Sequence, residues 1–287
     1  MRESLKARSG KFWMNLNPLV ALGSIHINRG LLKQFVLRSF QERHKGSLLG
    51  VTWSILLPVM MMGLYTLVFG FIFGSKYNVI PSENKTDFGL GIFLSLTLFG
   101  LISDSLAVSP GTVLNYPNFV RKVVFPLEIL PVSTFGATLI NFLISIGLFV
   151  IGLVFVGRGL SITALWFPLI VFPMLLMALG IHWLFSALGV FLRDISQFMV
   201  FLNQALLYAS AIFYSTTKVK GTNLEFMLPF LEMNPIVRAV ETSRNVMLWH
   251  IPAQIGDLLY LYGIGIGFFC VGFACFQQLK PAFSDVI

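Results

Sequence analysis

The side chains best suited to chemistry are scattered along the sequence and form no recognisable catalytic set. The four histidines, His26, His44, His182 and His250, lie far apart and show no metal-ligand spacing. The 287 residues contain no GxxxxGK[ST] phosphate-binding loop and no HExxH, GxSxG or DxD pattern. His182 follows a long apolar run without acidic residues, so we expect a packed, neutral side chain. Catalysis and a cofactor bound by this chain are therefore not expected.

A regular aromatic pattern is a candidate for binding. Tyr65, Phe69 and Phe73 recur every four residues, which would place their rings along one face of a helix. Such a stripe usually contacts lipid or neighbouring helices. It would also suit sugar rings, whose apolar C–H faces pack against aromatic planes. The residues alone leave both interpretations open.

The composition indicates that membrane helices position these side chains. The chain is 56% apolar and only 11% charged, and its mean hydropathy is +0.82. Soluble domains carry about 25% charged residues. These values exclude an ordinary soluble enzyme, a disordered chain and a disulfide scaffold. The two cysteines, Cys270 and Cys275, lie in one apolar run and are expected to be small packing residues.

Six runs without Asp, Glu, Lys or Arg predict six transmembrane helices in an all-α membrane protein. A helix needs about 20 apolar residues to cross the hydrocarbon core. Arg158 alone separates the third run from the fourth, which predicts a tight hairpin at 157–159. The second run is short, but it continues beyond Asp104. The runs are 46–75, 88–103, 129–157, 159–192, 195–217 and 258–279.

The distribution of Lys and Arg predicts the orientation. Six spans place both termini on one side of the membrane, and that side carries 13 of the 20 basic residues. An excess of basic residues marks the cytoplasmic side. We therefore expect cytoplasmic termini. The same bias accounts for the net charge of +8, so a nucleic-acid partner is not expected.

The segment 28–45 is expected to be an amphipathic helix in the cytoplasmic headgroup region. Its apolar residues recur at helical spacing opposite a basic face, a pattern typical of interfacial helices. A simple stop-transfer flank is the alternative. The apolar positions are Leu32, Phe35, Val36 and Phe40, and the basic ones are Lys33, Arg38, Arg43 and Lys45.

The cytoplasmic loop 114–126 is expected to form a rigid projection for a partner protein. Prolines break it into short pieces, and a solvated loop has no need of so many apolar residues. Asn118 is expected to cap a short helix with Arg121 and Lys122 on its polar side. The alternative is a helix that lies on the bilayer.

Two further segments are expected on the outer side. The loop 76–87 has charges of both signs and Pro81, and we expect a solvated connection without a role. The stretches 224–231 and 235–249 are apolar but too short to cross. Asn234-Pro235 is a good helix start, with Asn as cap and Pro in the first position. Two short helices that enter the outer leaflet and return could form a gate or an interfacial cover.

Taken in order, these segments resemble the permease subunit of bacterial ABC-2 type exporters of lipid-linked polysaccharides. That group includes exporters of O-antigen, capsule and teichoic acid. The resemblance covers nearly the whole chain from residue 30 onward, as a single transmembrane domain over 1–287. The segments that carry it are RHKGSLLGVTWSILLPVMMMGLYTLVFGFIFG (43–74), LNYPNFVRKVVFPLEILP (114–131), FLRDISQFMVFLNQALLYASAIFYS (191–215) and MNPIVRAVETSRNVML (233–248).

The resemblance implies partners and a cargo. Two permease copies would pair with two separate ATPase subunits, which would bind the ATP and Mg. The cargo would be an undecaprenyl-diphosphate-linked polysaccharide, most simply an O-antigen, moved outward across the bacterial inner membrane. An external motor agrees with the sequence, because no span carries the ionisable groups that ion-coupled transport needs near the midplane.

The resemblance also implies roles for particular residues. The segment 28–45 would be a cytoplasmic gate helix and 222–249 would form periplasmic gate helices, with Glu232, Asn234, Pro235 and Arg238 as candidate gate residues. The aromatics Tyr65, Phe69 and Phe73 would line the channel. From their charge, Arg38, Arg43 and Lys45 could attract the lipid diphosphate, although topogenic charge explains them equally well. The coupling helix that docks into the ATPase would comprise Asn115, Tyr116, Pro117, Asn118, Phe119, Val120, Arg121 and Lys122.

Two alternatives remain. One is an ABC-2 permease for another lipid or a drug, against which the aromatic stripe argues only weakly. The other is a membrane glycosyltransferase, which would need clustered carboxylates at a membrane face that the sequence lacks. The sequence does not identify the polymer.

Overall fold

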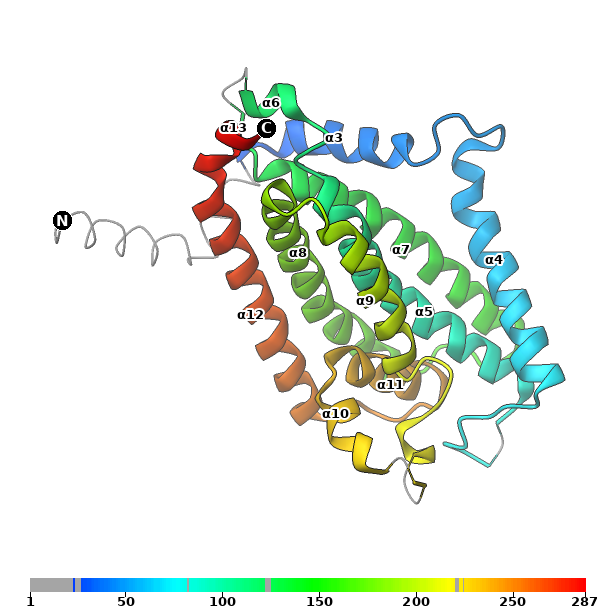
Figure 1. Cartoon of the computed structure of the whole chain (residues 1–287). Coiled ribbons are helices and arrows are strands. Elements are labelled where there is room, and N and C mark those ends of the chain that lie inside the picture. The colour runs from blue at the N-terminus through cyan, green and yellow to red at the C-terminus, as the bar shows by residue number, and fades with distance from the viewer. Residues whose placement is uncertain (1–22, 24–26, 82, 122–124, 220–221, 224) are drawn as a thin grey trace.

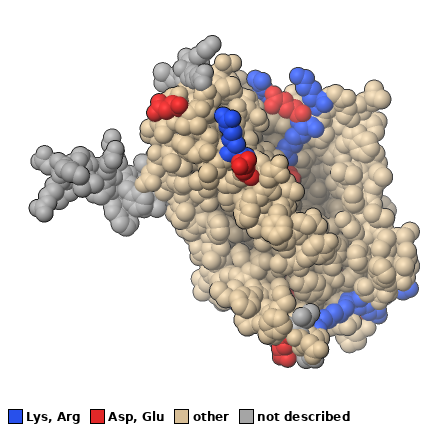
Figure 2. Space-filling model, in the orientation of Figure 1, with Lys and Arg blue, Asp and Glu red and all other residues tan. Residues whose placement is uncertain are grey.

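The computed structural model describes residues 23, 27–81, 83–121, 125–219, 222–223 and 225–287. Within these residues the chain is helical and contains no β-strand. The long helices form one bundle, with short helices at its two ends (Figure 1). Figure 2 shows Lys and Arg gathered at these two ends, with a face between them that is almost free of charge. This distribution fits a protein that spans a membrane.

Among the described residues, five helical stretches are long and apolar enough to cross a membrane, and they match five of the six expected runs. They contain α4 (Trp53–Tyr65) with its π-helical continuation Thr66–Ile72, α5 (Lys85–Val108), α7 (Ile129–Phe155), α8 (Phe167–Phe191) and α12 (Ile255–Leu279). Between α7 and α8, Gly157 and Gly159 have φ values of 79° and 65°, which glycine adopts without strain. They form the expected turn.

The helix within the remaining expected run, 195–217, is shorter than a full span. Its helix α9 (Ile195–Ala209) has 15 residues, or about 22 Å of length, against a hydrocarbon core of about 30 Å. Figure 1 shows α9 running from the end of the bundle with α6 toward the end with α10, and its Asn203 donates a hydrogen bond to the Ser103 carbonyl of α5 at 3.0 Å. Five of the six expected spans are therefore long enough to cross the membrane as helices. The sixth is helical only over α9, after which the chain is irregular.

A buried arginine explains where α9 stops. Arg244, only 3% exposed, donates hydrogen bonds to the carbonyl oxygens of Ala211 (3.0 Å) and Ile212 (3.4 Å). The Tyr77 hydroxyl also donates to the Ile212 carbonyl, at 2.9 Å. These bonds satisfy carbonyl groups that a continuing helix would have used. Ala211 has a left-handed φ of 50°, which breaks the helical course.

The pair α8 and α12 packs at close range. At Gly180, Gly265 and Gly272, an added side chain would collide with backbone atoms of the opposite helix. Small residues at such positions let membrane helices approach closely. On the other side of α8, His182 is buried against Phe135, with Nδ1 3.1 Å from the Ala178 carbonyl oxygen. It occupies a packing position.

One end of the bundle carries α3 (Arg29–Glu42), α6 (Pro117–Arg121) and α13 (Phe283–Val286) (Figure 1). The expected helix at 28–45 is confirmed over Arg29–Glu42, with Phe35 and Phe40 buried. It lies across α7, where Val36 contacts Gly136 so closely that a side chain at Gly136 would clash.

The other end carries α10 (Leu228–Met233) and α11 (Pro235–Leu248). The predicted helix start is confirmed: Asn234 Oδ1 accepts a hydrogen bond from the Ile236 amide at 2.9 Å, and Pro235 is the first helical residue. The expectation for the loop 76–87 is wrong. Tyr77, Glu83 and Asp87 are buried there, and Glu83 accepts the backbone amides of Tyr77 and Asn78, each at 2.7 Å.

Candidate transport cavity and coupling surface

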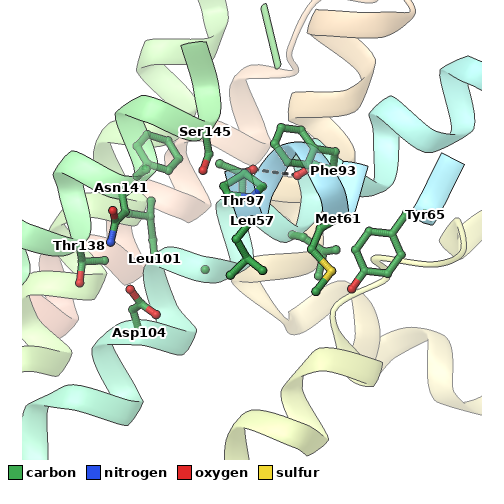
Figure 3. A pocket seen from close by; sticks show the side chains of 14 residues that line it. Leu57, Met61, Tyr65, Phe93, Thr97, Leu101, Asp104, Thr138, Asn141 and Ser145 are labelled. Atoms are coloured by element: carbon green, nitrogen blue, oxygen red, sulfur yellow. Dashed lines mark hydrogen bonds between the residues drawn. The ribbon is translucent and has the colours of Figure 1, made fainter. Parts of the chain in front are cut away.

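A cavity of about 280 Å³ lies between α4, α5 and α7. Thr97 and Asp104 line it from α5, while Thr138, Asn141 and Ser145 recur on one face of α7. Figure 3 shows Asp104, Thr138, Asn141 and Ser145 on one side of the cavity, with Leu57, Met61 and Tyr65 of α4 on the facing side. Polar side chains that face a cavity in a membrane bundle mark a substrate path.

One buried polar atom of this cavity lacks a hydrogen-bond partner among the described residues. Asn141 Oδ1 is buried, and no described residue donates a hydrogen bond to it. A buried acceptor without a donor costs free energy unless a ligand or water supplies one. Thr97 differs, because its hydroxyl donates to the Phe93 carbonyl at 2.8 Å. The side chains of Asn141 and Ser145, which form no hydrogen bond with a described residue, are thus the candidates in this cavity for bonding a bound hydroxyl group.

Arg43 bonds two of the residues that line the cavity, at the α3 end of the bundle. Its Nη1 donates to Asp104 Oδ2 at 2.9 Å and its Nη2 to Thr138 Oγ1 at 2.8 Å. Arg43 therefore links the end of α3 to both α5 and α7. The sequence placed Asp104 only near a span end and did not pair it, because these residues are 61 positions apart.

The three predicted entrance cations do not converge on one site. Arg38 Nε donates to Glu42 Oε1 at 2.8 Å, and this hydrogen bond lowers the pKa of Glu42 below its ordinary value. Arg43 pairs with Asp104. Lys45 is exposed and forms no ion pair with any described residue. Two of the three cations are thus neutralised by carboxylates.

The aromatic stripe forms, and it has a fourth member. Ring centroids are 6.2 Å apart for Tyr65 and Phe69 and 5.8 Å apart for Phe69 and Phe73. Phe213, from the irregular chain after α9, stacks on Phe69 at 5.3 Å. Of the three predicted aromatics only Tyr65 lines the cavity, and Phe73 is 67% exposed. Sequence spacing could not reveal Phe213, because it lies on another segment.

The predicted coupling segment is attached to α3 by an aromatic cluster. The Phe119 ring lies 5.5 Å from Phe35 of α3 and 4.9 Å from Phe125, with Tyr116 at 6.0 Å. The Tyr116 hydroxyl donates to Glu42 Oε2 at 3.2 Å, and burial raises the pKa of Tyr116. The segment is therefore packed directly against α3.

The outward side of this segment remains open for a partner. Asn115, Pro117 and Asn118 are exposed, and Val120 is half-buried. The helix begins at Pro117, so the predicted cap at Asn118 is wrong, since that residue lies inside the first turn. The helix ends at Arg121, and Lys122 lies outside the described residues.

The predicted gate residues join three helices at the opposite end. Arg238 of α11 donates through Nε to the Glu232 carbonyl at 2.7 Å and through Nη1 to Asp257 Oδ1 at 3.1 Å. Its guanidinium also lies 4.4 Å from the Tyr260 ring centre. These contacts tie α10 and α12 to α11. Among the described residues no three His, Cys, Asp or Glu side chains gather as a metal site.

Residues 30–248 match the family model of the ABC-2 type transporters. The chain therefore belongs to this family. It is a multi-pass membrane component of a transporter and not an enzyme, and its family implies a separate ATPase partner.

Two relatives are similar over nearly their whole length. The chain is 24% identical over 260 residues to the O-antigen export system permease protein RfbA of Myxococcus xanthus, which covers 90% of this chain and 96% of the relative. It is also 24% identical over 265 residues to the protein of the same name from Klebsiella pneumoniae, covering 90% and 95%.

Proposed function

We propose that this chain is the channel-forming subunit of an ATP-driven exporter of undecaprenyl-diphosphate-linked polysaccharide. The polysaccharide is of the O-antigen type, and it moves from the cytoplasm to the periplasm. The membrane is the bacterial inner membrane, with both termini and the α3 end of the bundle on the cytoplasmic side.

The main observation behind this proposal is that two cavities with different linings lie beside α4. The first is lined mainly by apolar side chains but also carries the five polar side chains described above. The second, of about 600 Å³, is lined by side chains of α4, α5 and α7 that are mostly apolar, including Met62, Leu67 and Phe155. A cargo with a hydroxyl-rich head and a long hydrocarbon chain suits this pair, because each part meets a lining of its own polarity.

The names of the relatives support a glycan as the head. Both relatives are O-antigen export permeases, and both align over nearly their full length. Tyr65 supplies an aromatic ring at the polar cavity, where it can pack against a sugar face. Of the three predicted entrance cations, Lys45 is the one without an ion pair to a described residue, so it is the candidate to attract the diphosphate, since Arg38 and Arg43 are already paired.

The motor is a separate subunit that binds ATP and Mg, while this chain binds no cofactor. The exposed side of Asn115–Asn118 receives the ATPase. Movement then passes through Phe119 to Phe35 of α3, and through Arg43 to α5 and α7. Rigid packing of aromatic side chains suits such transmission.

A second copy of this chain completes the channel. A cavity of about 280 Å³ holds only a short piece of a polymer. Of the residues of α4, Ser54 alone is buried, so most of this helix is available to a partner copy. We propose an assembly of two permeases and two ATPases.

Deletion of the gene in its host tests this function. The proposed exporter predicts loss of surface polysaccharide and accumulation of the lipid-linked polymer inside the cell, both restored by the full chain. Unchanged surface polysaccharide, with loss of another lipid or of drug resistance, would contradict the glycan cargo. Incorporation of labelled sugar by the purified chain would contradict transport in favour of a glycosyltransferase.

A further inference from the structure

A second cavity with polar lining residues lies at the α11 end of the bundle, and it shares no lining residue with the cavity between α4, α5 and α7. It measures about 280 Å³ and is bounded by the loop after α4, the turn at 215–217, the second half of α11 and the chain at 249–251. We call it the outer pocket. Its lining includes Asn78, Glu241, Arg244, Asn245 and Trp249.

Backbone strain gathers around the outer pocket. Among the described residues, three other than glycine have a left-handed φ: Asn78 (61°), Ala211 (50°) and His250 (57°). Asn78 lines the pocket, His250 lies between the lining residues Trp249 and Ile251, and Ala211 accepts the hydrogen bond from Arg244. Strained residues persist only where the surrounding structure holds them, and they cluster at functional sites.

The walls of the pocket are held rigidly. The Arg244 guanidinium lies 4.1 Å from the Tyr77 ring centre and bonds the chain after α9. The Glu241 carboxylate accepts hydrogen bonds from the Thr216 amide (2.7 Å) and hydroxyl (2.9 Å). Such a frame presents its remaining groups in fixed positions, which favours binding over mere packing.

The lining groups that remain free to bind a ligand are neutral hydrogen-bonding groups. The side-chain amides of Asn78 and Asn245 and the indole of Trp249 form no hydrogen bond with any described residue. The charges of Glu241 and Arg244 offset each other. Hydroxyl groups both donate and accept hydrogen bonds, so a neutral polyhydroxylated ring matches this lining.

The size of the pocket limits the ligand to one ring. Small-molecule sites measure about 300–1,000 Å³, and this pocket lies near the lower limit. Tyr77 is 1% exposed and Trp249 6%, so their ring faces offer little stacking surface. Recognition would rest on hydrogen bonds to the ring hydroxyls.

We propose that the outer pocket binds a single neutral sugar residue through Asn78, Asn245 and Trp249. Under the proposed function, on which this assignment rests, the sugar belongs to the exported glycan, and the pocket is a contact on the outer side of the membrane.

Saturation-transfer NMR on the full transporter with its ATPase, in nanodiscs, tests the assignment. The probes are D-glucose, D-mannose, D-galactose and N-acetyl-D-glucosamine, with D-glucuronate as a charged comparison. Asn78→Gly removes one amide while glycine tolerates the φ of 61°. Asn245→Ala removes another. Gln254→Ala is the control, since Gln254 is an exposed amide at the same end that does not line the pocket.

We expect at least one neutral sugar to bind and each pocket variant to weaken it about fivefold, the effect of one lost hydrogen bond. The control variant should bind as the wild type does. Three results would overturn the proposal that the outer pocket binds a neutral sugar. They are no binding of any neutral sugar, binding by the pocket variants as tight as by the wild type, and binding of D-glucuronate alone.

The deletion experiment keeps the two proposals distinguishable. If deletion abolishes surface polysaccharide but no neutral sugar binds the wild type, the proposal of a sugar-binding pocket is wrong and the proposal of a polysaccharide exporter is supported. If neutral sugars bind through the pocket but deletion leaves surface polysaccharide unchanged, the proposal of a polysaccharide exporter is wrong and the proposal of a sugar-binding pocket is supported.

Discussion

At the scale of single residues, ion pairs distinguish Arg38 of α3 from Arg43, which directly follows this helix, although the sequence treats the two arginines alike. Arg38 pairs with Glu42 on the surface, with 58% and 44% of the two side chains exposed. Arg43 is 23% exposed and bonds Asp104 and Thr138 at the cavity rim. Exposed pairs contribute little to stability, whereas partly buried hydrogen-bonded charges contribute more. The two positions therefore form a matched experiment.

Replacing Arg43 by Ala is expected to lower the free energy of unfolding by about 1–2 kcal/mol and to reduce export, because Asp104 and Thr138 lose their shared donor. Arg38→Ala should change stability by about 0–1 kcal/mol. Thermal unfolding of the purified proteins and surface polysaccharide in complemented cells measure both effects. Identical behaviour of the two variants would show that Arg43 does not link α3 to the bundle.

A second residue-scale prediction concerns the buried charge on α11. Arg244→Met removes the donor for the carbonyls of Ala211 and Ile212 and should cost about 2–4 kcal/mol of unfolding free energy. Arg238→Met, which removes a 32% exposed side chain, should cost less. Denaturation of the two purified variants in parallel checks this order. The reverse order would mean that Arg244 does not hold the end of α9.

At the scale of elements, α6 is the part that connects a partner to the bundle. Its Phe119 belongs to one aromatic cluster with Phe35 of α3 and Phe125. Because α3 in turn contacts α7 at Val36 and Gly136, displacement of α6 reaches a helix that lines the cavity. The coupling residues therefore act through packing.

Phe119→Ala is expected to leave membrane insertion intact while export falls and cargo no longer stimulates ATP hydrolysis. Arg121→Ala should have the same effect if that residue contacts the ATPase. Phe226→Ala, at an exposed position on the opposite end, is the control. ATPase activity of the purified complex and surface polysaccharide are the measurements. Normal coupling in the Phe119 and Arg121 variants would remove the role assigned to α6.

Much of the element order could be predicted from the sequence, because length and hydropathy suffice to locate an apolar helix. The helix start at Asn234-Pro235 could also be predicted, because a capping residue and the helix it caps are neighbours in the sequence. The end of α9 was not predictable, because the Arg244 that bonds Ala211 is 33 residues away. Tyr77 is similarly buried by a residue far along the chain, so the loop 76–87 looked solvated.

In the candidate site, too, features within one helix could be predicted from the sequence, whereas contacts between distant segments could not. The aromatic stripe follows from spacing on one helix, but Phe213 and the pairing of Arg43 with Asp104 bring distant segments together. The cavity itself needs α4, α5 and α7 at once. Polar residues such as Asn141 carry a sequence signal, since an amide within an apolar run is costly there.

At the scale of the whole molecule, charge and polarity are separated along the bundle. Basic residues gather at the two ends, and the polar cavity lies between them beside α4 (Figures 2 and 3). A glycan that crosses an apolar barrier needs hydrogen-bonding groups along its path. The polar face of α7 supplies such groups, and a second copy would enclose them.

The most direct test of this account is export by cells whose only copy carries Asn141→Leu, compared with Asn141→Ser. Leucine removes the amide that faces the cavity at similar volume, whereas serine keeps a hydroxyl. The measurement is the ratio of surface polysaccharide to lipid-linked polymer retained inside. We predict a fall on the order of fivefold for leucine and a ratio near the wild type for serine. A wild-type ratio for leucine, at equal protein level, would contradict the cavity as the transport path.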